Sequence, residues 1–259
     1  MGEMLCLKMM QIKLPRCHTF LKAEKFLGAQ FFASCKMMGF ASWLYQGICA
    51  GLSSFVIAKT MTDETPIYFK NHKNEYKELK CKETMCTYTM ISYSLMAMYF
   101  VLSFLGFWCS ALFSLSLCSS VFVTSTCTFI LIPRCRDDEV AMRTMLSPLS
   151  QMTHNINCIM MLCELVNRQE FFPTIPHHIG LSLFYLVFYA TLQYQKDLQL
   201  YQFLNMYSPY SILYIGFFVF FIIFIHAFMT YFSNLLFALP YRLQYMMAIG
   251  LGGSLGTWY

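Results

Sequence analysis

Long apolar stretches separated by short polar segments dominate this sequence. Residues 86–132 form 47 consecutive positions without a charged side chain, and residues 217–228 read FFVFFIIFIHAF. A helix that crosses the hydrocarbon core of a bilayer needs about 20 predominantly apolar residues. The stretch 86–132 is therefore long enough for two such helices, with a turn expected near Gly106–Ser110. This pattern predicts a chain that crosses a membrane several times.

Six stretches are predicted to be transmembrane helices. They cover residues 39–58, 86–107, 110–132, 149–166, 179–195 and 212–237. Because lipid offers no hydrogen-bonding partner, each span must satisfy its backbone groups within its own helix. The predicted fold class is therefore all-α, a polytopic transmembrane helical bundle, and residues 1–259 are predicted to form a single transmembrane domain. The tail after Pro240 is expected at the membrane interface.

The polar segments carry most of the charge. Segment 59–85 contains six lysines and five acidic residues, which predicts a solvated loop. Charged residues make up only 12% of the chain, whereas soluble domains contain about 25%. Five further basic residues precede the first long apolar stretch, on the opposite side of the first predicted helix from segment 59–85. The positive-inside rule therefore gives no orientation, and both the endomembrane system and the plasma membrane stay open as locations.

Several functional classes lack support in the sequence. The chain has no P-loop, no Rossmann glycine pattern and no basic patch typical of nucleic-acid binding. Its twelve cysteines include no CxxC pair and no zinc-type Cys/His spacing. Several lie inside apolar stretches, where cysteine is typically a small packing residue, while a disulfide between extramembrane cysteines and the oligomeric state stay open. The first 25 residues lack the apolar region and cleavage site of an ordinary secretory signal peptide.

Ionisable side chains inside predicted helices are candidates for function because placing them in a membrane is costly. Four positions qualify: Lys36, His154, Glu164 and His226. Lys36 lies near a helix end, where a lysine can extend its ammonium group to the headgroups. His226 stands alone in the most apolar helix. It is expected to be a neutral histidine bonded to a neighbouring helix, with catalysis as the alternative.

His154 and Glu164 share one predicted helix. They are ten residues apart in the sequence, or about 15 Å along the helix axis, so they cannot hydrogen-bond to each other. His154 follows a polar stretch near the helix start, where a half-hydrated imidazole can act as a general base near neutral pH. Glu164 is expected to have a separate role or to reach the opposite interface. Both side chains are predicted to face the bundle interior, because exposing an ionisable group to hydrocarbon costs at least about 2.5 kcal/mol.

Segment 151–165, QMTHNINCIMMLCEL, resembles a motif of the androgen-induced protein family. That motif is WLNHxMHT followed by an apolar helix that contains a glutamate. Its second histidine corresponds to His154 and its glutamate to Glu164. Segments 44–49 and 200–209 resemble further stretches of the family in the same order, so the resemblance covers about half of the chain.

The resemblance implies a multipass hydrolase of fatty acid esters of hydroxy fatty acids, without a metal or organic cofactor. The family pairs a threonine nucleophile on one helix with a histidine on another. Carried over to this sequence, the histidine is His154, and the threonine position falls on Cys35, with Ser34 one residue away. Either side chain can serve as a nucleophile once a base activates it.

The expected catalytic residues are therefore His154 with Cys35 or Ser34. The expected partners are a lipid substrate and the bilayer. The alternative is a non-catalytic multipass protein, such as a transporter, a receptor or a scaffold. A hydrolase requires a nucleophilic oxygen or sulfur within about 3–4 Å of the His154 imidazole or one water molecule away, whereas a binding protein does not.

Overall fold

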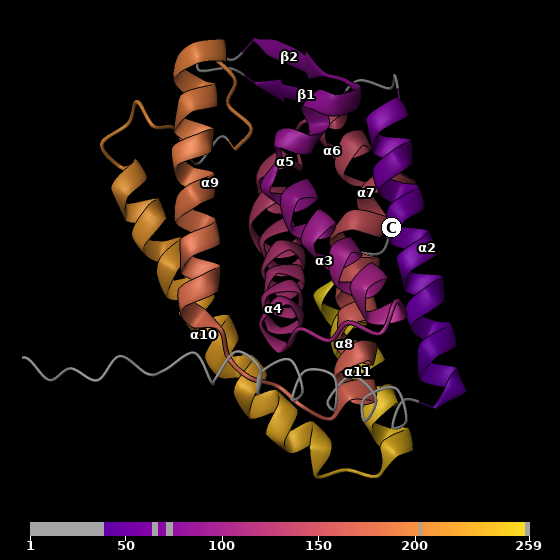
Figure 1. Cartoon of the computed structure of the whole chain (residues 1–259). Coiled ribbons are helices and arrows are strands. Elements are labelled where there is room, and N and C mark those ends of the chain that lie inside the picture. Colours follow the sequence, from indigo (N-terminus) through magenta and orange to yellow (C-terminus); the bar gives the residue numbers. More distant parts are fainter. Residues whose placement is uncertain (1–38, 64–66, 71–74, 202–203, 257–259) are drawn as a thin grey trace, which may run out of the picture.

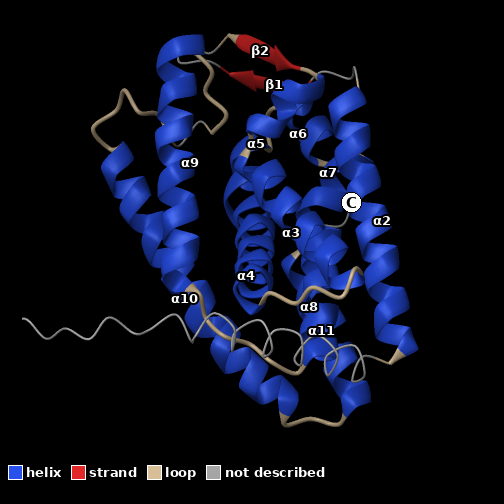
Figure 2. Ribbon diagram, viewed as in Figure 1, coloured by secondary structure: helices blue, strands red, loops and turns tan. Residues whose placement is uncertain are grey.

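Helices make up most of the protein in the computed structural model, which describes residues 39–63, 67–70, 75–201 and 204–256 (Figure 1). Within these residues the strands belong to one two-stranded hairpin, and the other regular elements are helical (Figure 2). The all-α fold class predicted from the apolar pattern is confirmed. Ser34, Cys35 and Lys36 lie outside the described residues.

Most elements follow one another along the chain with short connections, and the connection 197–210 between α9 and α10 is longer. In order they are α2 (Phe40–Thr62), β1 (Ile67–Lys70), β2 (Tyr76–Leu79), the 3₁₀-helix η1 (Cys81–Cys86), α3 (Tyr88–Phe104), α4 (Ser110–Thr126), the π-helical η2 (Cys127–Leu131), α5 (Ile132–Cys135), α6 (Glu139–Met145), α7 (Pro148–Gln151), the π-helical η3 (Met152–Ile156), α8 (Asn157–Arg168), α9 (Ile175–Lys196), α10 (Ser211–Phe237) and α11 (Tyr241–Leu255).

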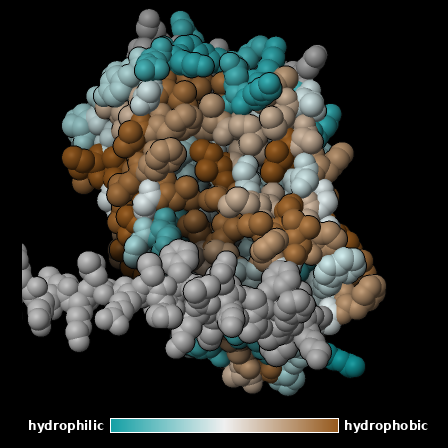
Figure 3. All heavy atoms as spheres, viewed as in Figure 1, coloured by the Kyte–Doolittle hydropathy of each residue, from teal (hydrophilic) through white to brown (hydrophobic). Residues whose placement is uncertain are grey.

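Four helices in the described part of the chain are long and apolar enough to cross a membrane: α2, the continuous helix Ser110–Cys135, α9 and α10. Apolar side chains cover the middle of the visible face, and hydrophilic side chains gather at its upper end (Figure 3). A helix also forms over the predicted span 149–166, as α7, η3 and α8, but it is not among these four. That the chain crosses the membrane six times therefore stays a prediction.

The continuous helix Ser110–Cys135 occupies the centre of the bundle (Figure 1). Of its most apolar stretch 72% is buried, against 17–28% for the three other long apolar helices. Its first part, α4, packs against α3, α8, α9, α10 and α11. Small buried side chains on α4, such as Ser114, Ser116 and Ser119, let these neighbours approach closely. The core of the protein is therefore built around α4.

Glu164 on α8 is fully buried and faces the bundle interior, as predicted. Its Oε1 accepts hydrogen bonds from Gln46 Nε2 at 2.8 Å, Tyr99 OH at 2.7 Å and Arg168 Nε at 2.8 Å. These donors belong to α2, α3 and α8. The Arg168 guanidinium also lies 3.9 Å from the centroid of the Trp108 ring. Glu164 thus joins three helices inside the bundle.

Segment 59–85 contains regular structure and differs in this from the predicted solvated loop. The strands β1 and β2 pair antiparallel, with Ile67 opposite Leu79, and aromatic side chains in both strands favour this conformation. The hairpin also contacts the rest of the protein, because Lys77 Nζ lies 3.7 Å from a carboxylate oxygen of Asp197 after α9. The segment is therefore a structured polar cap at one end of the bundle (Figure 2).

Helix α11 packs along α8 and is part of the bundle, whereas the tail after Pro240 was expected at the membrane interface. Its buried residues Gln244, Ala248 and Gly252 recur every four positions and so share one face. At Gly252 the contact leaves no room for a side chain, since a Cβ there would lie 2.6 Å from Ile159 Cγ1. The glycine permits the close approach of α11 and α8.

Candidate functional site

A small cavity of about 80 Å³ lies between α3, α4, η3, α9 and α10. Its walls are largely apolar, and the space is large enough to hold water. Seven of the lining side chains carry a polar group: Tyr88, Thr89, Thr126, His154, Ser182, Tyr185 and Tyr201. The predicted base, His154, is therefore placed in a cavity inside the bundle, which agrees with its predicted inward orientation.

The position of His154 is fixed by its backbone. It lies in the π-helical segment η3, and the Thr124 hydroxyl on α4 donates a hydrogen bond to its carbonyl oxygen. π-Helical turns inside longer helices are frequent at functional sites. The Nδ1 atom of His154 is buried and has no hydrogen-bond partner within the part of the chain that the structure describes. This nitrogen is therefore available to a water molecule or a substrate.

Thr126 is a second lining residue of the same cavity with an unsatisfied polar atom. It is the last residue of α4 before η2, and its Oγ1 is buried with no hydrogen-bond partner among the described residues. On the same helix, Ser114 Oγ and Ser116 Oγ are also buried without a partner among the described residues, whereas Ser120 Oγ donates to the Ser116 carbonyl at 2.8 Å. A buried polar group left unsatisfied costs about 1–3 kcal/mol. Two residues with such atoms line one cavity, which indicates a place where a bound molecule completes the hydrogen bonding.

A chain of buried hydrogen bonds begins at the cavity wall. Tyr88 OH lies 3.1 Å from His178 Nε2, His178 Nδ1 lies 3.2 Å from His226 Nε2, and His226 Nδ1 lies 3.4 Å from Cys118 Sγ. Ser119 Oγ is also 3.3 Å from His178 Nε2. The chain connects α3, α9, α10 and α4. It confirms the expectation that His226 is bonded to a neighbouring helix.

Two tyrosines from outside the central helix hold the cavity wall in place. The Tyr201 hydroxyl accepts a hydrogen bond from the backbone N–H of Tyr88 at 3.1 Å. The Tyr185 hydroxyl donates to the Cys86 carbonyl at 3.2 Å. Burial raises the pKa of Tyr201 above its usual range, so this phenol stays neutral. The start of α3 is thereby fixed against α9 and the segment that follows it.

The sequence pattern did not identify His178 or Thr126 as candidate site residues. His178 lies between the predicted helices 149–166 and 179–195. In the structure α9 already begins at Ile175, so His178 lies in its first turn and is fully buried. Pro176 is the signal that could have found it, because proline is favoured in the first turn of a helix. Thr126 belongs to a run of serines and threonines within a charge-free helix, which indicates a polar face directed at other helices.

The structure does not test the other nucleophiles that the sequence predicts. Ser34 and Cys35 lie outside the described residues, so their pairing with His154 stays a prediction. Residues 252–256 match the G-x-S-x-G pattern, whose serine acts as a nucleophile on a strand-to-helix turn. Here Ser254 lies inside α11 and donates to the Leu251 carbonyl at 2.9 Å. It is a helix residue and not such a nucleophile.

The described residues contain no group of three or more His, Cys, Asp and Glu side chains placed to hold a metal ion. Comparison with protein-family models, with curated proteins and with solved structures finds no match to this chain. The family resemblance of segment 151–165 therefore stays a prediction, and the arguments for function rest on the geometry of the cavity.

Proposed function

We propose that this protein is a multipass membrane hydrolase of lipid esters in which His154 acts as general base. One observation carries the proposal: His154 and Thr126 line a single cavity with apolar walls, and each has a buried polar atom without a hydrogen-bond partner among the described residues. Nucleophilic catalysis needs such a pair. The resemblance to the androgen-induced family adds independent support, because it also selects His154.

Thr126 is the nucleophile that the described residues offer. His154 removes the proton of the attacking hydroxyl, whose oxygen adds to the ester carbonyl carbon. The alkoxide leaving group then takes this proton from the imidazolium, and water cleaves the acyl-enzyme in a second round with the same base. Because the two atoms are not directly hydrogen-bonded, substrate binding or one bridging water has to complete the contact. Ser34 and Cys35 are the alternative nucleophiles that the resemblance implies.

Tyr88 is proposed to stabilise the oxyanion formed during attack. Its hydroxyl lies at the cavity wall within 3.1 Å of His178 Nε2 and 3.3 Å of Ser182 Oγ. A donor held in place before the reaction begins stabilises developing charge without reorganisation. In the tautomer in which His178 Nε2 is unprotonated, the Tyr88 hydroxyl donates its hydrogen bond to this nitrogen. In the tautomer in which Nε2 carries the proton, the Tyr88 hydroxyl accepts from it and can donate its own proton to the substrate.

A second candidate function is proton-coupled transport. The observation that favours it is the buried chain from Tyr88 through His178 and His226 to Cys118, since chains of ionisable groups inside membrane proteins often relay protons. Such a transporter needs no nucleophile beside His154. The effect of His154 on ester cleavage therefore separates the two functions.

Ester hydrolysis by the purified full-length protein tests the proposal. The substrate is a fatty acid ester of a hydroxy fatty acid in detergent micelles, and release of the acid is measured. We expect His154→Ala to lower the rate about 10²–10⁴-fold, the usual contribution of a general base. The matched control is His177→Ala, because His177 is exposed at the start of α9. Equal rates for both variants and the unmodified protein, or no hydrolysis by any of them, contradict the proposal.

A further inference from the structure

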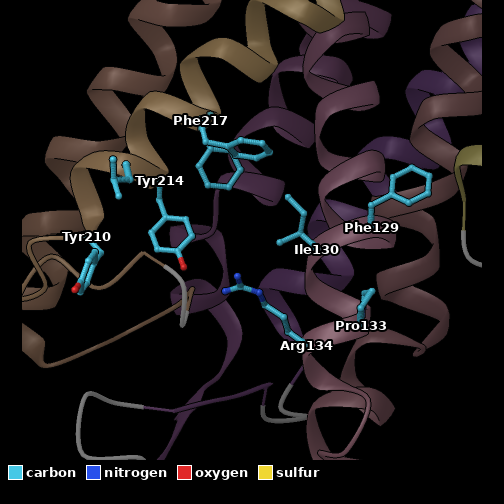
Figure 4. A pocket seen from close by; sticks show the side chains of 9 residues that line it. Phe129, Ile130, Pro133, Arg134, Tyr210, Tyr214 and Phe217 are labelled. Carbon is cyan, nitrogen blue, oxygen red and sulfur yellow. The ribbon is translucent and has the colours of Figure 1, made fainter.

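A second and much larger cavity, of about 640 Å³, lies between the end of the central helix and the beginning of α10. Phe129 and Ile130 of η2 and Pro133 of α5 form one side, and Tyr214 and Phe217 of α10 form the other (Figure 4). Several of the lining side chains are exposed at the surface of the bundle. The cavity is therefore an open groove between two of the helices that are long and apolar enough to cross a membrane.

The groove has a polar end and an apolar body. Arg134, Tyr210 and Tyr214 supply all of its polar side-chain groups. The Arg134 guanidinium carbon lies 5.8 Å from the centroid of the Tyr214 ring, and Figure 4 shows the guanidinium directed toward this tyrosine. The remaining walls are phenylalanine, leucine, isoleucine and proline side chains, such as Phe129 and Leu213.

The charge near this end of the groove favours an anion. Arg134 begins the polar run that follows the apolar part of the central helix. Arg134 is the only charged side chain among the described residues that line the groove. A guanidinium forms strong charge-assisted hydrogen bonds with a carboxylate, often two in parallel.

We propose that this groove binds the anion of a long-chain fatty acid. The carboxylate lies at Arg134, beside Tyr214, and the acyl chain lies along Phe129, Leu213 and Phe217. A volume of about 640 Å³ is in the range of pockets that hold one small molecule, which suits one acyl chain and not the two chains and large headgroup of a phospholipid.

The groove adjoins the cavity of His154, because Phe218 lines both. Ester hydrolysis releases a fatty acid, so the ligand of the groove belongs to the same chemical class as the proposed product. This link rests on the proposed function, whereas binding of the fatty acid does not. The groove then receives the released acid, or holds the acid end of a substrate whose ester lies beyond Phe218.

Binding of a fluorescent polyene fatty acid to the purified full-length protein in detergent tests the proposal. We expect saturable binding that oleate displaces and that oleyl alcohol, which lacks the charge, displaces at least about tenfold less well. Arg134→Gln is expected to weaken binding about tenfold or more, with partial recovery in Arg134→Lys. Arg143→Gln is the matched control. It is expected to bind normally, because Arg143 and its partner Glu139 do not line the groove.

A second variant tests the apolar body of the groove. Leu213→Trp places a larger side chain in the groove on an exposed surface of α10, and we expect it to reduce binding without lowering the thermal stability. Equal displacement by oleate and oleyl alcohol, equal displacement by a phospholipid, or unchanged binding in Arg134→Gln overturns the proposal. His154→Ala separates this test from the test of the proposed function. The variant is expected to lose ester hydrolysis and to bind the fatty acid normally.

Discussion

Thr126 and His154 both lie at π-helical segments of their helices. Thr126 immediately precedes the π-helical segment η2, and His154 lies within the π-helical segment η3. A π-turn interrupts the regular α-helical bonding and changes the direction in which nearby side chains point. Both helices therefore depart from α geometry at the cavity, and each contributes one of its lining residues there. This coincidence gives the proposed catalytic pair its physical basis.

Replacing Thr126 by valine separates catalysis from stability. Valine has nearly the same shape, and it removes a hydroxyl that has no partner among the described residues. We expect unchanged or higher thermal stability in detergent, because removing an unsatisfied buried group relieves a penalty of about 1–3 kcal/mol, together with a loss of ester hydrolysis. Ser120→Ala, which removes a bonded hydroxyl from the same helix, serves as control and keeps its activity. Retained hydrolysis in Thr126→Val assigns the nucleophile to Ser34 or Cys35.

Glu164 is predicted to matter for stability. Its ion pair with Arg168 is buried, with side-chain exposures of 0% and 8%. Glu164→Gln leaves the Arg168 charge without its partner, and breaking a buried pair in this way costs about 3–5 kcal/mol. Glu139→Gln is a close control, since Glu139 forms the same i,i+4 pair with Arg143 at exposures of 78% and 80%, and such surface pairs contribute at most about 1 kcal/mol. Thermal unfolding in detergent measures both, and equal effects of the two substitutions refute the prediction.

At the scale of the helices and strands, the sequence predicted those that carry long apolar stretches. The expected helices 86–107 and 212–237 correspond to α3 and α10, because hydropathy alone identifies such segments. Helix α11 and the hairpin in segment 59–85 have mixed composition, and their conformation depends on packing against α8 and α9. Such contacts between distant parts of the chain are invisible in a local pattern.

The candidate site was predictable only in part, for the same reason. His154 stands out because a histidine in an apolar helix is costly. Thr126 is one of many small polar residues on α4, and nothing in the local sequence distinguishes it from its neighbours. Only the arrangement of the helices shows that Thr126 and His154 line one cavity.

The contact between α8 and α11 gives a prediction at the element scale. Gly252→Ala brings a Cβ to 2.6 Å from Ile159 Cγ1 and 3.2 Å from Ile159 Cα, and overpacking of this kind costs about 1–3 kcal/mol. Gly253→Ala is the matched control. Its Cβ meets nothing within 4 Å, so the higher helix propensity of alanine is expected to stabilise α11 by up to about 1 kcal/mol. Opposite shifts in melting temperature are therefore expected, and a shift of the same sign for both variants contradicts the close packing.

At the scale of the whole molecule, three of the four long apolar helices lie at the periphery and expose most of their surface. Alkaline carbonate strips peripheral proteins from membranes and leaves spanning helices in place. We therefore expect the protein to stay in the membrane pellet after carbonate treatment and to enter solution only with detergent. Release by carbonate alone contradicts the multipass arrangement, and a known peripheral protein in the same preparation provides the control.

The burial of α8 among its neighbours also has a consequence for the order of synthesis on the ribosome. Two of the donors that bond Glu164, Gln46 and Tyr99, are translated before it, so the carboxylate meets them as soon as α8 emerges. The surface of α8 around Ile159 faces α11, which is translated after α8. Before α11 is synthesised, nothing from α11 packs against this face of α8. A chain that ends before Tyr241 therefore leaves the face exposed, where the cell's quality-control machinery can bind it.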